Sequence, residues 1–212
     1  MTELILALDV PDKGRAVTIA RACALYLDAI KIGYPLVLSA GLGITRELAD
    51  LRIPLIADFK VADIPNTNRL IADQVFSAGF SAIICHAFTG RDAVLACVES
   101  AHHYGGTCFV VAEMSHPGAT EFFHGGVAER LAQVAIACGA DGIIAPATRP
   151  ERTKKLRLIV GAKKIYSPGV GAQGGDLRAV AGIVDGIIIG RAIYESDDPA
   201  TVAKNFARVC KM

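Results

Sequence analysis

The chain has 212 residues, of which 52% are hydrophobic and 20% charged, and its formal net charge is +1. This length and composition allow one large core and predict a single domain over residues 1–212. The near-neutral charge without basic runs argues against nucleic acid or an anionic membrane as the main partner. No apolar run approaches the roughly 18 residues of a membrane-spanning helix, so we expect no membrane segment.

The cysteines and histidines show no metal-binding pattern. Six cysteines occur without a Cys-x-x-Cys spacing, and five histidines occur without a His-x-x-x-His motif. Reduced core thiols and no metal site are therefore expected. The first residues lack the basic and long apolar regions of a secretory signal, which predicts a cytoplasmic protein.

Apolar runs alternate with segments of helical spacing along the chain. The predicted strands lie at 4–8, 29–32, 53–57 with its end at 58–60, 81–86, 107–112, 141–145, 164–166 and 186–189. The predicted helices lie at 12–27, from 35 to about 51, 64–78, 89–104, 126–138, 151–159 and about 199–209. This alternation predicts an α/β fold, a single closed (β/α)8 TIM barrel. An open doubly wound sheet is the alternative, but its usual Gly-x-Gly-x-x-Gly after the first strand is absent.

Charged residues stand at the C-terminal ends of the predicted strands. Asp58 and Lys60 are two apart and point to one face of the third strand, and Asp63 lies just beyond it. A structural ion pair would explain this triplet alone. The other polar strand ends are Asp9, Lys31, His86, Glu113 and Arg191. Because strand ends converge at one mouth of a barrel, where active sites are built, we interpret the whole set as an active site.

Two glycine-rich turns follow the last two predicted strands, namely Pro168-Gly169-Val170-Gly171 and Ile189-Gly190-Arg191. Loops at these places in barrels commonly hold a phosphate, because glycine lets backbone N–H groups approach the anion. Arg191 adds a bidentate donor. Gln173 lies in the glycine-rich loop 171–176, where it could close over a ligand. The pattern predicts a phosphorylated substrate bound at one side of the mouth while the Asp and Lys residues act at the other.

Four motifs occur in order along the chain. They are Asp58-x-Lys60-x-x-Asp63-Ile64-Pro65-Asn66-Thr67, Met114-Ser115-His116-Pro117-Gly118, the stretch Pro168 to Asp176, and Gly190-Arg191. Together they resemble orotidine 5'-monophosphate decarboxylase in its compact archaeal form, from Asp9 to about Tyr194. The acid-Lys-acid triplet also resembles Mg²⁺-dependent sugar-phosphate barrels, such as keto-gulonate phosphate decarboxylase and hexulose phosphate synthase. A Mg²⁺-dependent sugar-phosphate decarboxylase or aldolase is therefore the alternative function, although the other motifs separate the two groups.

The resemblance implies a cofactor-free decarboxylation of orotidine 5'-monophosphate to UMP, the last step of de novo pyrimidine biosynthesis, with no metal. It implies that Lys60 stabilises the C6 carbanion and protonates it, and that Lys31, Asp58 and Asp63 complete the catalytic array. It also implies a homodimer in which Asp63 and Thr67 reach across the interface into the partner's site.

The same resemblance implies which residues bind the substrate. Asp9 and Lys31 would hold ribose hydroxyls, Ser115 the pyrimidine amide, Gln173 both phosphate and base, and Arg191 with the Gly190 backbone the phosphate. Pro168, Gly169 and Gly171 complete the substrate-binding set. His116 is expected to be a turn residue and His86 to pack at the rim. A third hypothesis, a non-catalytic nucleotide sensor, predicts UMP binding without turnover, and the intact Lys60 argues against it.

Overall fold

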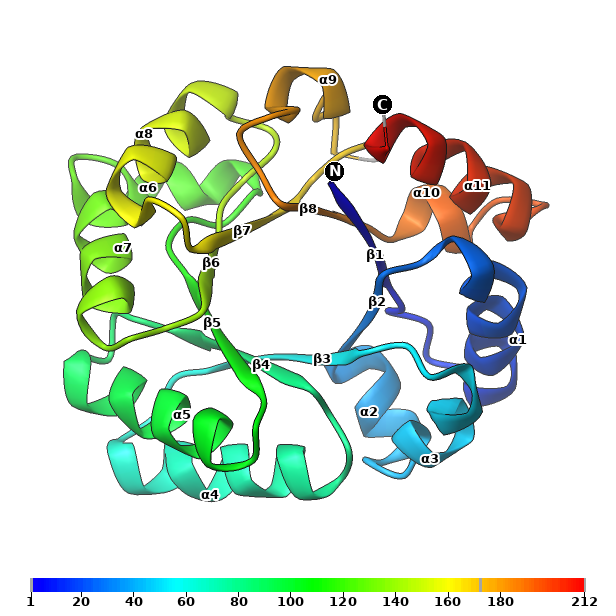
Figure 1. The fold of residues 1–212 in the computed structure, drawn as a ribbon, viewed down its shortest axis with the longest axis horizontal. Helices are drawn as coiled ribbons and strands as arrows, with labels where there is room; N and C mark the ends of the chain where they lie inside the picture. Colours follow the sequence, from blue (N-terminus) through cyan, green and yellow to red (C-terminus); the bar gives the residue numbers. More distant parts are fainter. Residues whose placement is uncertain (1, 172, 212) are drawn as a thin grey trace.

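The computed structural model describes residues 2–171 and 173–211. In this part of the chain, eight parallel strands form a closed barrel in chain order, and β8 pairs with β1. The strands are β1 (Glu3–Ala7), β2 (Ala29–Gly33), β3 (Leu55–Val61), β4 (Ala82–His86), β5 (Thr107–Val111), β6 (Gly142–Ile144), β7 (Lys164–Pro168) and β8 (Gly186–Ile189). Figure 1 looks down this ring of strands, with the helices outside it. The predicted TIM barrel is confirmed.

The longer helices cover the outside of the barrel. They are α1 (Lys13–Cys23), α2 (Tyr34–Ala40), α3 (Ile44–Leu48), α4 (Pro65–Ser77), α5 (Arg91–His103), α7 (Val127–Ala137), α8 (Pro150–Val160) and α11 (Pro199–Cys210). Single turns are α6 (Thr120–Phe123), α9 (Leu177–Val180), α10 (Arg191–Tyr194) and the 3-10 turns η1 (Ala24–Tyr26), η2 (Ala49–Leu51) and η3 (Pro117–Ala119). Asp12 and Asp198 cap α1 and α11, because each carboxylate accepts a backbone N–H of the first turn. No helix in the described residues is both long and apolar enough to span a membrane.

Two apolar layers explain the hydrophobic strands. One lies between the barrel and its helices. The other fills the barrel itself with Ile5, Ala7, Ala29, Ile56, Ala82, Ile84, Phe109, Val111, Ile144, Tyr166 and Ile188. The rings of Phe109 and Tyr166 stack with their centroids 4.4 Å apart across this interior. Because both faces of the strands are buried, their sequences are nearly continuous runs of apolar residues and do not alternate between apolar and polar residues.

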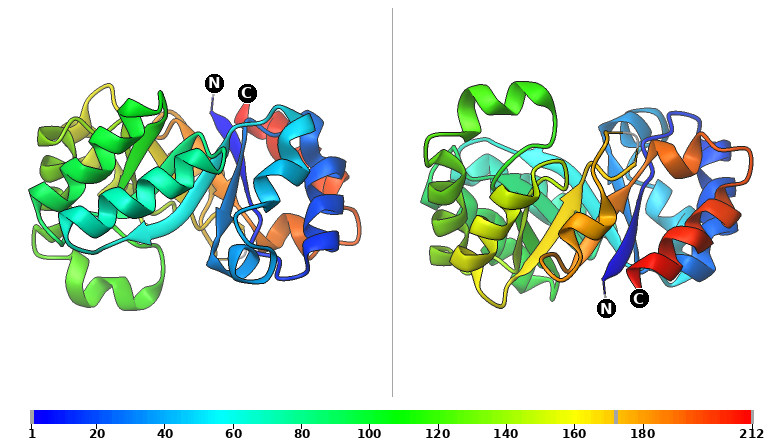
Figure 2. Two further views of the ribbon diagram at one scale, coloured as in Figure 1. Left: turned by 90° about the horizontal axis from the view of Figure 1, so that it is seen from below. Right: turned by 90° about the horizontal axis from the view of Figure 1, so that it is seen from above.

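Three features differ from the expected regular alternation. The connection between β7 and β8 contains only the single turn α9. The connection between β5 and α7 contains η3 and α6, which project from the end of the barrel in Figure 2. The pairing of β3 with β4 shifts between Ala57 and Val61, and Lys60 has a φ of 46° there.

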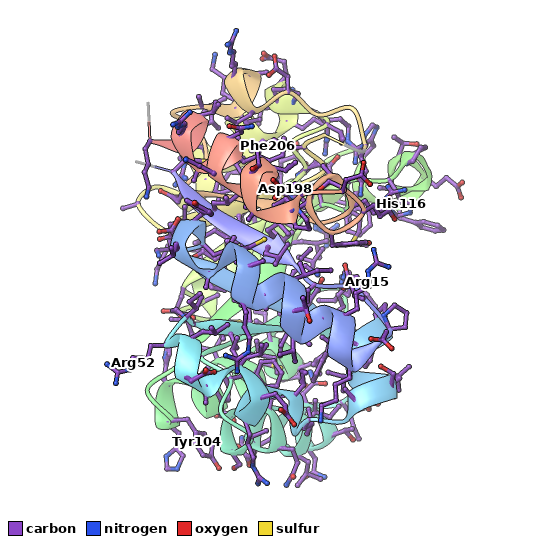
Figure 3. The ribbon with its side chains drawn as sticks, turned by 90° about the vertical axis from the view of Figure 1, so that its right-hand side faces the viewer. Arg15, Arg52, Tyr104, His116, Asp198 and Phe206 are labelled. Carbon is purple, nitrogen blue, oxygen red and sulfur yellow. The ribbon has the colours of Figure 1, made fainter. Side chains whose placement is uncertain are left out.

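The two ends of the barrel are distinct. Figure 3 shows His116 and Arg15 toward the end where the strands finish, and Arg52 toward the opposite end. At that opposite end, the Tyr166 hydroxyl donates to Glu3 Oε2 at 2.6 Å and Lys164 Nζ donates to Glu3 Oε1 at 2.6 Å. Polar side chains therefore close the barrel behind its apolar interior.

Candidate active site

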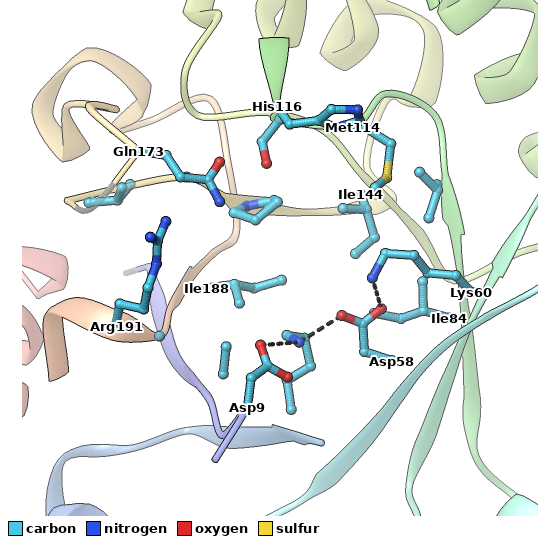
Figure 4. A pocket seen from close by; sticks show the side chains of 18 of the residues that line it. Asp9, Asp58, Lys60, Ile84, Met114, His116, Ile144, Gln173, Ile188 and Arg191 are labelled. Atoms are coloured by element: carbon cyan, nitrogen blue, oxygen red, sulfur yellow. Dashed lines mark hydrogen bonds and ion pairs between the residues drawn. The ribbon is translucent and has the colours of Figure 1, made fainter. Parts of the chain in front are cut away.

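The C-terminal ends of the strands surround a cavity of about 300 Å³ (Figure 4). Most of the predicted site residues line it, namely Asp9, Lys31, Asp58, Lys60, Ser115, Pro168, Gly169, Gln173, Gly190 and Arg191. Residues from β1, β2, β3, β5, β7 and β8 or from the loops after them thus meet in one place. Three predicted residues, Asp63, Thr67 and Gly171, do not line it.

Four side chains of alternating sign, Asp9, Lys31, Asp58 and Lys60, form a charged row along one wall. Lys31 Nζ donates to Asp58 Oδ2 at 2.6 Å and lies 3.6 Å from Asp9 Oδ2. Lys60 Nζ donates to Asp58 Oδ1 at 2.8 Å. The Lys31 and Asp58 side chains are 7% and 11% exposed, whereas that of Lys60 is 37% exposed. The two inner charges are therefore fixed, and the Lys60 ammonium is open to the cavity.

The charges stabilise one another. Burial acts to lower the pKa of Lys31, but the Asp58 and Asp9 carboxylates outweigh it and hold that pKa above its ordinary value. Burial acts to raise the pKa of Asp58, but the ammonium groups of Lys31 and Lys60 hold it below its ordinary value. Lys31 and Asp58 are therefore both ionised at neutral pH.

The backbone of β3 sets the position of Lys60. Its φ of 46° lies in the left-handed region, which residues other than glycine rarely adopt. The register of the pairing with β4 also shifts around this residue, so the ladder is irregular there. The expectation that Asp58 and Lys60 meet simply because a regular strand alternates is therefore incomplete. The two side chains do meet, but on an irregular backbone.

Gln173, Gly190 and Arg191, for which the sequence predicts phosphate binding and which we call the anion side, line the cavity. Gln173 and Arg191 lie across from Lys60 in Figure 4. Gly169 has a φ of 103°, and a Cβ there would lie 2.9 Å from the methyl carbon of Thr148. Both the backbone conformation and the space therefore require glycine at this position. Ala172, which belongs to the predicted motif, lies outside the described residues.

The sequence prediction missed the apolar side of the cavity. Its apolar floor consists of Ala7, Ile84, Val111, Ile144 and Ile188, and Met114, Val170 and Tyr194 lie around it. Each floor residue also belongs to the cluster inside the barrel. Alternation along each strand, counted inward from its C-terminal end, could have identified these residues. Charges that face such a floor interact more strongly than charges in water.

One of the polar strand ends, Glu113, points elsewhere than predicted, whereas His86, for which packing at the rim is expected, lies with its ring centroid 5.0 Å from that of Phe88. Glu113 is fully buried and lies outside the cavity wall, so its expected place at the mouth is wrong. His86 faces a separate apolar groove, lined by His86, Phe88, Met114, Phe122, Phe123, Val127 and Leu131. Burial, and then the Lys60 charge, lower the pKa of His86 to about 4, although Asp58 opposes the shift. His116 stands at the N-terminal end of η3 and lines the edge of the cavity.

Asp63 lies on the connection from β3 into α4 and Thr67 in the first turn of α4, and neither lines the chain's own cavity. The Asp63 side chain accepts the backbone N–H of Ile64 at 2.7 Å, and its own backbone N–H donates to Asn68 Oδ1 at 2.9 Å. Asp63 is exposed. Within residues 2–171 and 173–211, no group of three or more His, Cys, Asp or Glu side chains is arranged to hold a metal ion.

Comparison with known proteins agrees with the motifs. Residues 2–206 match the model of the orotidine 5'-phosphate decarboxylase / HUMPS family. Orotidine 5'-phosphate decarboxylase of Methanosarcina acetivorans is 55% identical over 208 residues, covering 97% of this chain and 93% of that one. The Methanococcoides burtonii enzyme of that name is 56% identical over 204 residues, covering 95% and 94%.

A solved structure gives the same result. The crystal structure of orotidine 5'-monophosphate decarboxylase from Methanocaldococcus jannaschii, complexed with inhibitor BMP, matches with a TM-score of 0.95 and 42% identity over 100% of both chains. The resemblance inferred from the motifs is thereby confirmed. The chain belongs to the orotidine 5'-phosphate decarboxylase / HUMPS family.

Proposed function

We propose that this protein decarboxylates orotidine 5'-monophosphate to UMP without a cofactor. The observation that carries the proposal is the charged row, which faces an anion side across a cavity with an apolar floor. A phosphorylated substrate fits this layout, because its phosphate needs hydrogen-bond donors and positive charge at one end of the cavity, whereas its reacting carbon needs the charged row at the other. The relatives that are 55% and 56% identical carry the name of this enzyme.

The phosphate is assigned to the anion side. Arg191 supplies a guanidinium, Gly190 a backbone N–H, and Gln173 an amide that spans phosphate and base. Asp9 and Lys31 then face the ribose hydroxyls, and Ser115 faces the pyrimidine amide. Binding energy from the remote phosphate can be used at the reacting centre.

In this pose the orotate carboxylate lies near Asp58 and Lys60. Breaking the bond from C6 to the carboxyl carbon releases CO₂ and leaves the electron pair in an sp² orbital of C6, without a conjugated electron sink. The Lys60 ammonium stabilises that charge and donates a proton to C6, which gives UMP. The neutral amine then takes a proton from water. Asp58 holds the ammonium in place through its 2.8 Å hydrogen bond.

The protein is proposed to act as a homodimer, with a second copy of the chain covering the apolar groove. Phe88 and Phe122 in this groove are 64% and 74% exposed, and Ile64, next to Asp63, is 65% exposed. Exposed apolar side chains of this kind mark contact surfaces. His86 Nδ1 is buried there without a hydrogen-bond partner in the described structure. Since Asp63 and Thr67 do not line their own cavity, we assign them to the partner's site.

The dimer is tested by mixing two inactive variants, Lys60→Ala and Asp63→Ala. If Asp63 acts across the interface, each mixed dimer contains one site with both wild-type residues. An equimolar mixture should then regain about a quarter of wild-type activity, because half of the dimers are mixed and half of their sites are intact. Sedimentation should give twice the chain mass. No regain of activity from variants that form mixed dimers would place Asp63 in its own site.

The reaction is tested by the fall in orotate absorbance when the protein meets orotidine 5'-monophosphate in the presence of EDTA. The wild type should turn over, and Lys60→Ala should not. Lys13→Ala is the matched control, because Lys13 also pairs with a carboxylate, Glu47 at 2.7 Å, but on the exposed surface. It should keep full activity.

Other outcomes assign other functions. Activity on sugar phosphates that EDTA removes would indicate the Mg²⁺-dependent alternative, and tight UMP binding without turnover would indicate a sensor. A cytoplasmic location remains a prediction. It is supported by the six cysteines, which are all buried and free, as expected in a reducing compartment.

A further inference from the structure

The fully buried carboxylate of Glu113 lies behind the cavity wall and has no role in the reaction described above. Each of its oxygens accepts from a different arginine. Arg149 Nε donates to Oε1 at 2.8 Å, and Arg152 Nε donates to Oε2 at 2.6 Å. His124 Nε2 lies 3.8 Å from Oε1, and Glu129 lies 3.7 Å from Arg152. A carboxylate with no exposed surface requires such partners, because burial without them is strongly unfavourable.

The two arginines also hold the main chain on both sides of a short segment. Arg149 Nη2 donates to the carbonyl of Met114, and Arg152 Nη2 donates to the carbonyl of Phe123 at 3.0 Å. The segment between these carbonyls contains Ser115 and the turns η3 and α6, and it projects from the barrel end in Figure 2. The ion-paired cluster of Glu113, Arg149 and Arg152 thus binds both ends of this projecting segment to the start of α8.

A third contact from the same loop reaches Ser115 directly. Thr148, the residue before Arg149, donates its hydroxyl to the Ser115 carbonyl at 3.1 Å. The methyl carbon of Thr148 and the Cβ of Ser115 also lie 2.9 Å and 3.4 Å from where a Cβ of Gly169 would be. The loop after β6 therefore packs against Ser115 on one side and the Gly169 turn on the other.

We propose that Glu113 is a positioning residue that, through Arg149 and Arg152, places Ser115 to read the pyrimidine ring. This inference rests on the proposed function, because it takes Ser115 as the ring contact. Glu113 touches no substrate. It fixes the two guanidinium planes, these fix the carbonyls of Met114 and Phe123, and Ser115 is the cavity-lining residue next to Met114.

The geometry specifies which substitutions are informative. Glu113→Gln keeps the shape of the side chain but removes the charge that holds both arginines. Arg149→Lys keeps the charge, but a single ammonium cannot reproduce the separate Nε and Nη2 hydrogen bonds of a rigid guanidinium. Arg157→Lys is the matched control. Arg157 lies in α8, which Arg149 directly precedes, and it likewise holds a carboxylate, Asp185, and a carbonyl, that of Ile183, but toward the far end of the helix.

The test compares two ligands by isothermal titration calorimetry, UMP with its ring and ribose 5-phosphate without one. Glu113→Gln and Arg149→Lys should each weaken UMP binding about tenfold, the effect of one misplaced hydrogen bond, and should change ribose 5-phosphate binding less than about twofold. Arg157→Lys should change neither. Equal weakening of both ligands, or of neither, would overturn the proposal. If Glu113→Gln does not fold, Arg149→Lys decides.

A double-mutant cycle on kcat/KM for orotidine 5'-monophosphate supplies an independent readout. If Arg149 acts through Ser115, adding Arg149→Lys to Ser115→Ala should lower kcat/KM by less than about twofold further. Multiplicative losses would overturn the proposal. Wild-type turnover is measured first, and a wild type without activity counts against the proposed function. If the wild type is active but the variants change the binding of UMP and of ribose 5-phosphate equally, the result counts only against this inference.

Discussion

Replacing Asp58 by asparagine tests how the charged row contributes to the free protein. The change keeps the side-chain shape but removes the anion between Lys31 and Lys60, which lie 2.6 and 2.8 Å from it. Lys31 would then keep only Asp9, at 3.6 Å, for a charge that is almost fully buried. Removing one partner of a buried ion pair lowers the free energy of unfolding by about 3 kcal/mol at the lower end of the measured range. We use this lower value because Asp9 still pairs with Lys31. For a chain of this length, that corresponds to a fall in Tm of roughly 6–12 °C.

Urea unfolding followed by far-UV circular dichroism measures this change, since the chain has no tryptophan. The control is Asp50→Asn, whose carboxylate accepts from Arg21 at 2.7 and 3.0 Å but is 58% exposed, so the loss should be too small to resolve. The pKa of Asp58 is held low in the folded state, so its contribution is present above its ordinary pKa. It should be lost as the pH falls through the lowered value. A variant as stable as wild type at pH 7 would refute the reasoning.

Two further predictions concern stability. The folded protein keeps His86 neutral down to about pH 4, whereas in the unfolded chain His86 takes up a proton near pH 6.5. Between pH 7.5 and pH 5 the free energy of unfolding of wild type should therefore fall by about 1 to 2 kcal/mol relative to that of His86→Asn. A urea-midpoint difference that is constant with pH would contradict this. Gly142→Ala should cost about 2 to 4 kcal/mol, because its Cβ would lie 2.4 Å from the carbonyl oxygen of Lys164 and 2.7 Å from Phe109. The control is Gly43→Ala, whose added Cβ meets nothing within 4 Å on a right-handed backbone and should leave stability unchanged or slightly raised. Thermal melts of the two variants beside wild type measure both effects.

The strands could be predicted from the sequence because most of their residues are buried on both faces and a polar residue stands at or just after the end of several of them. Local patterns do not determine where a side chain points once its strand has ended. Glu113 follows β5 by two residues, and its direction depends on arginines 36 and 39 positions later. The left-handed backbone at Lys60 likewise has no local signal, and it coincides with the shift in the pairing of β3 with β4.

In the candidate site, too, some residues could be predicted from local sequence and others could not. The motifs identified the polar residues of the cavity, whose chemistry is specific. The apolar floor went unnoticed, because Ile84, Val111 and Ile144 look like any other core residues until the barrel closes. In the proposed dimer, the site that Asp63 joins would belong to a second chain, which no pattern within one chain specifies.

The filled interior of the barrel has a consequence for the order of events in turnover. Beneath the cavity, Phe109 and Tyr166 stack, and Glu3 with Lys164 closes the far end. In the described part of the chain, no passage therefore continues downward from the cavity. In the proposed reaction, the substrate would enter and CO₂ and UMP would leave through the one mouth that Gln173 lines. The CO₂ formed beside Lys60 would then have to pass the bound nucleotide or follow it out, so the order of product release would depend on this mouth and not on a second exit.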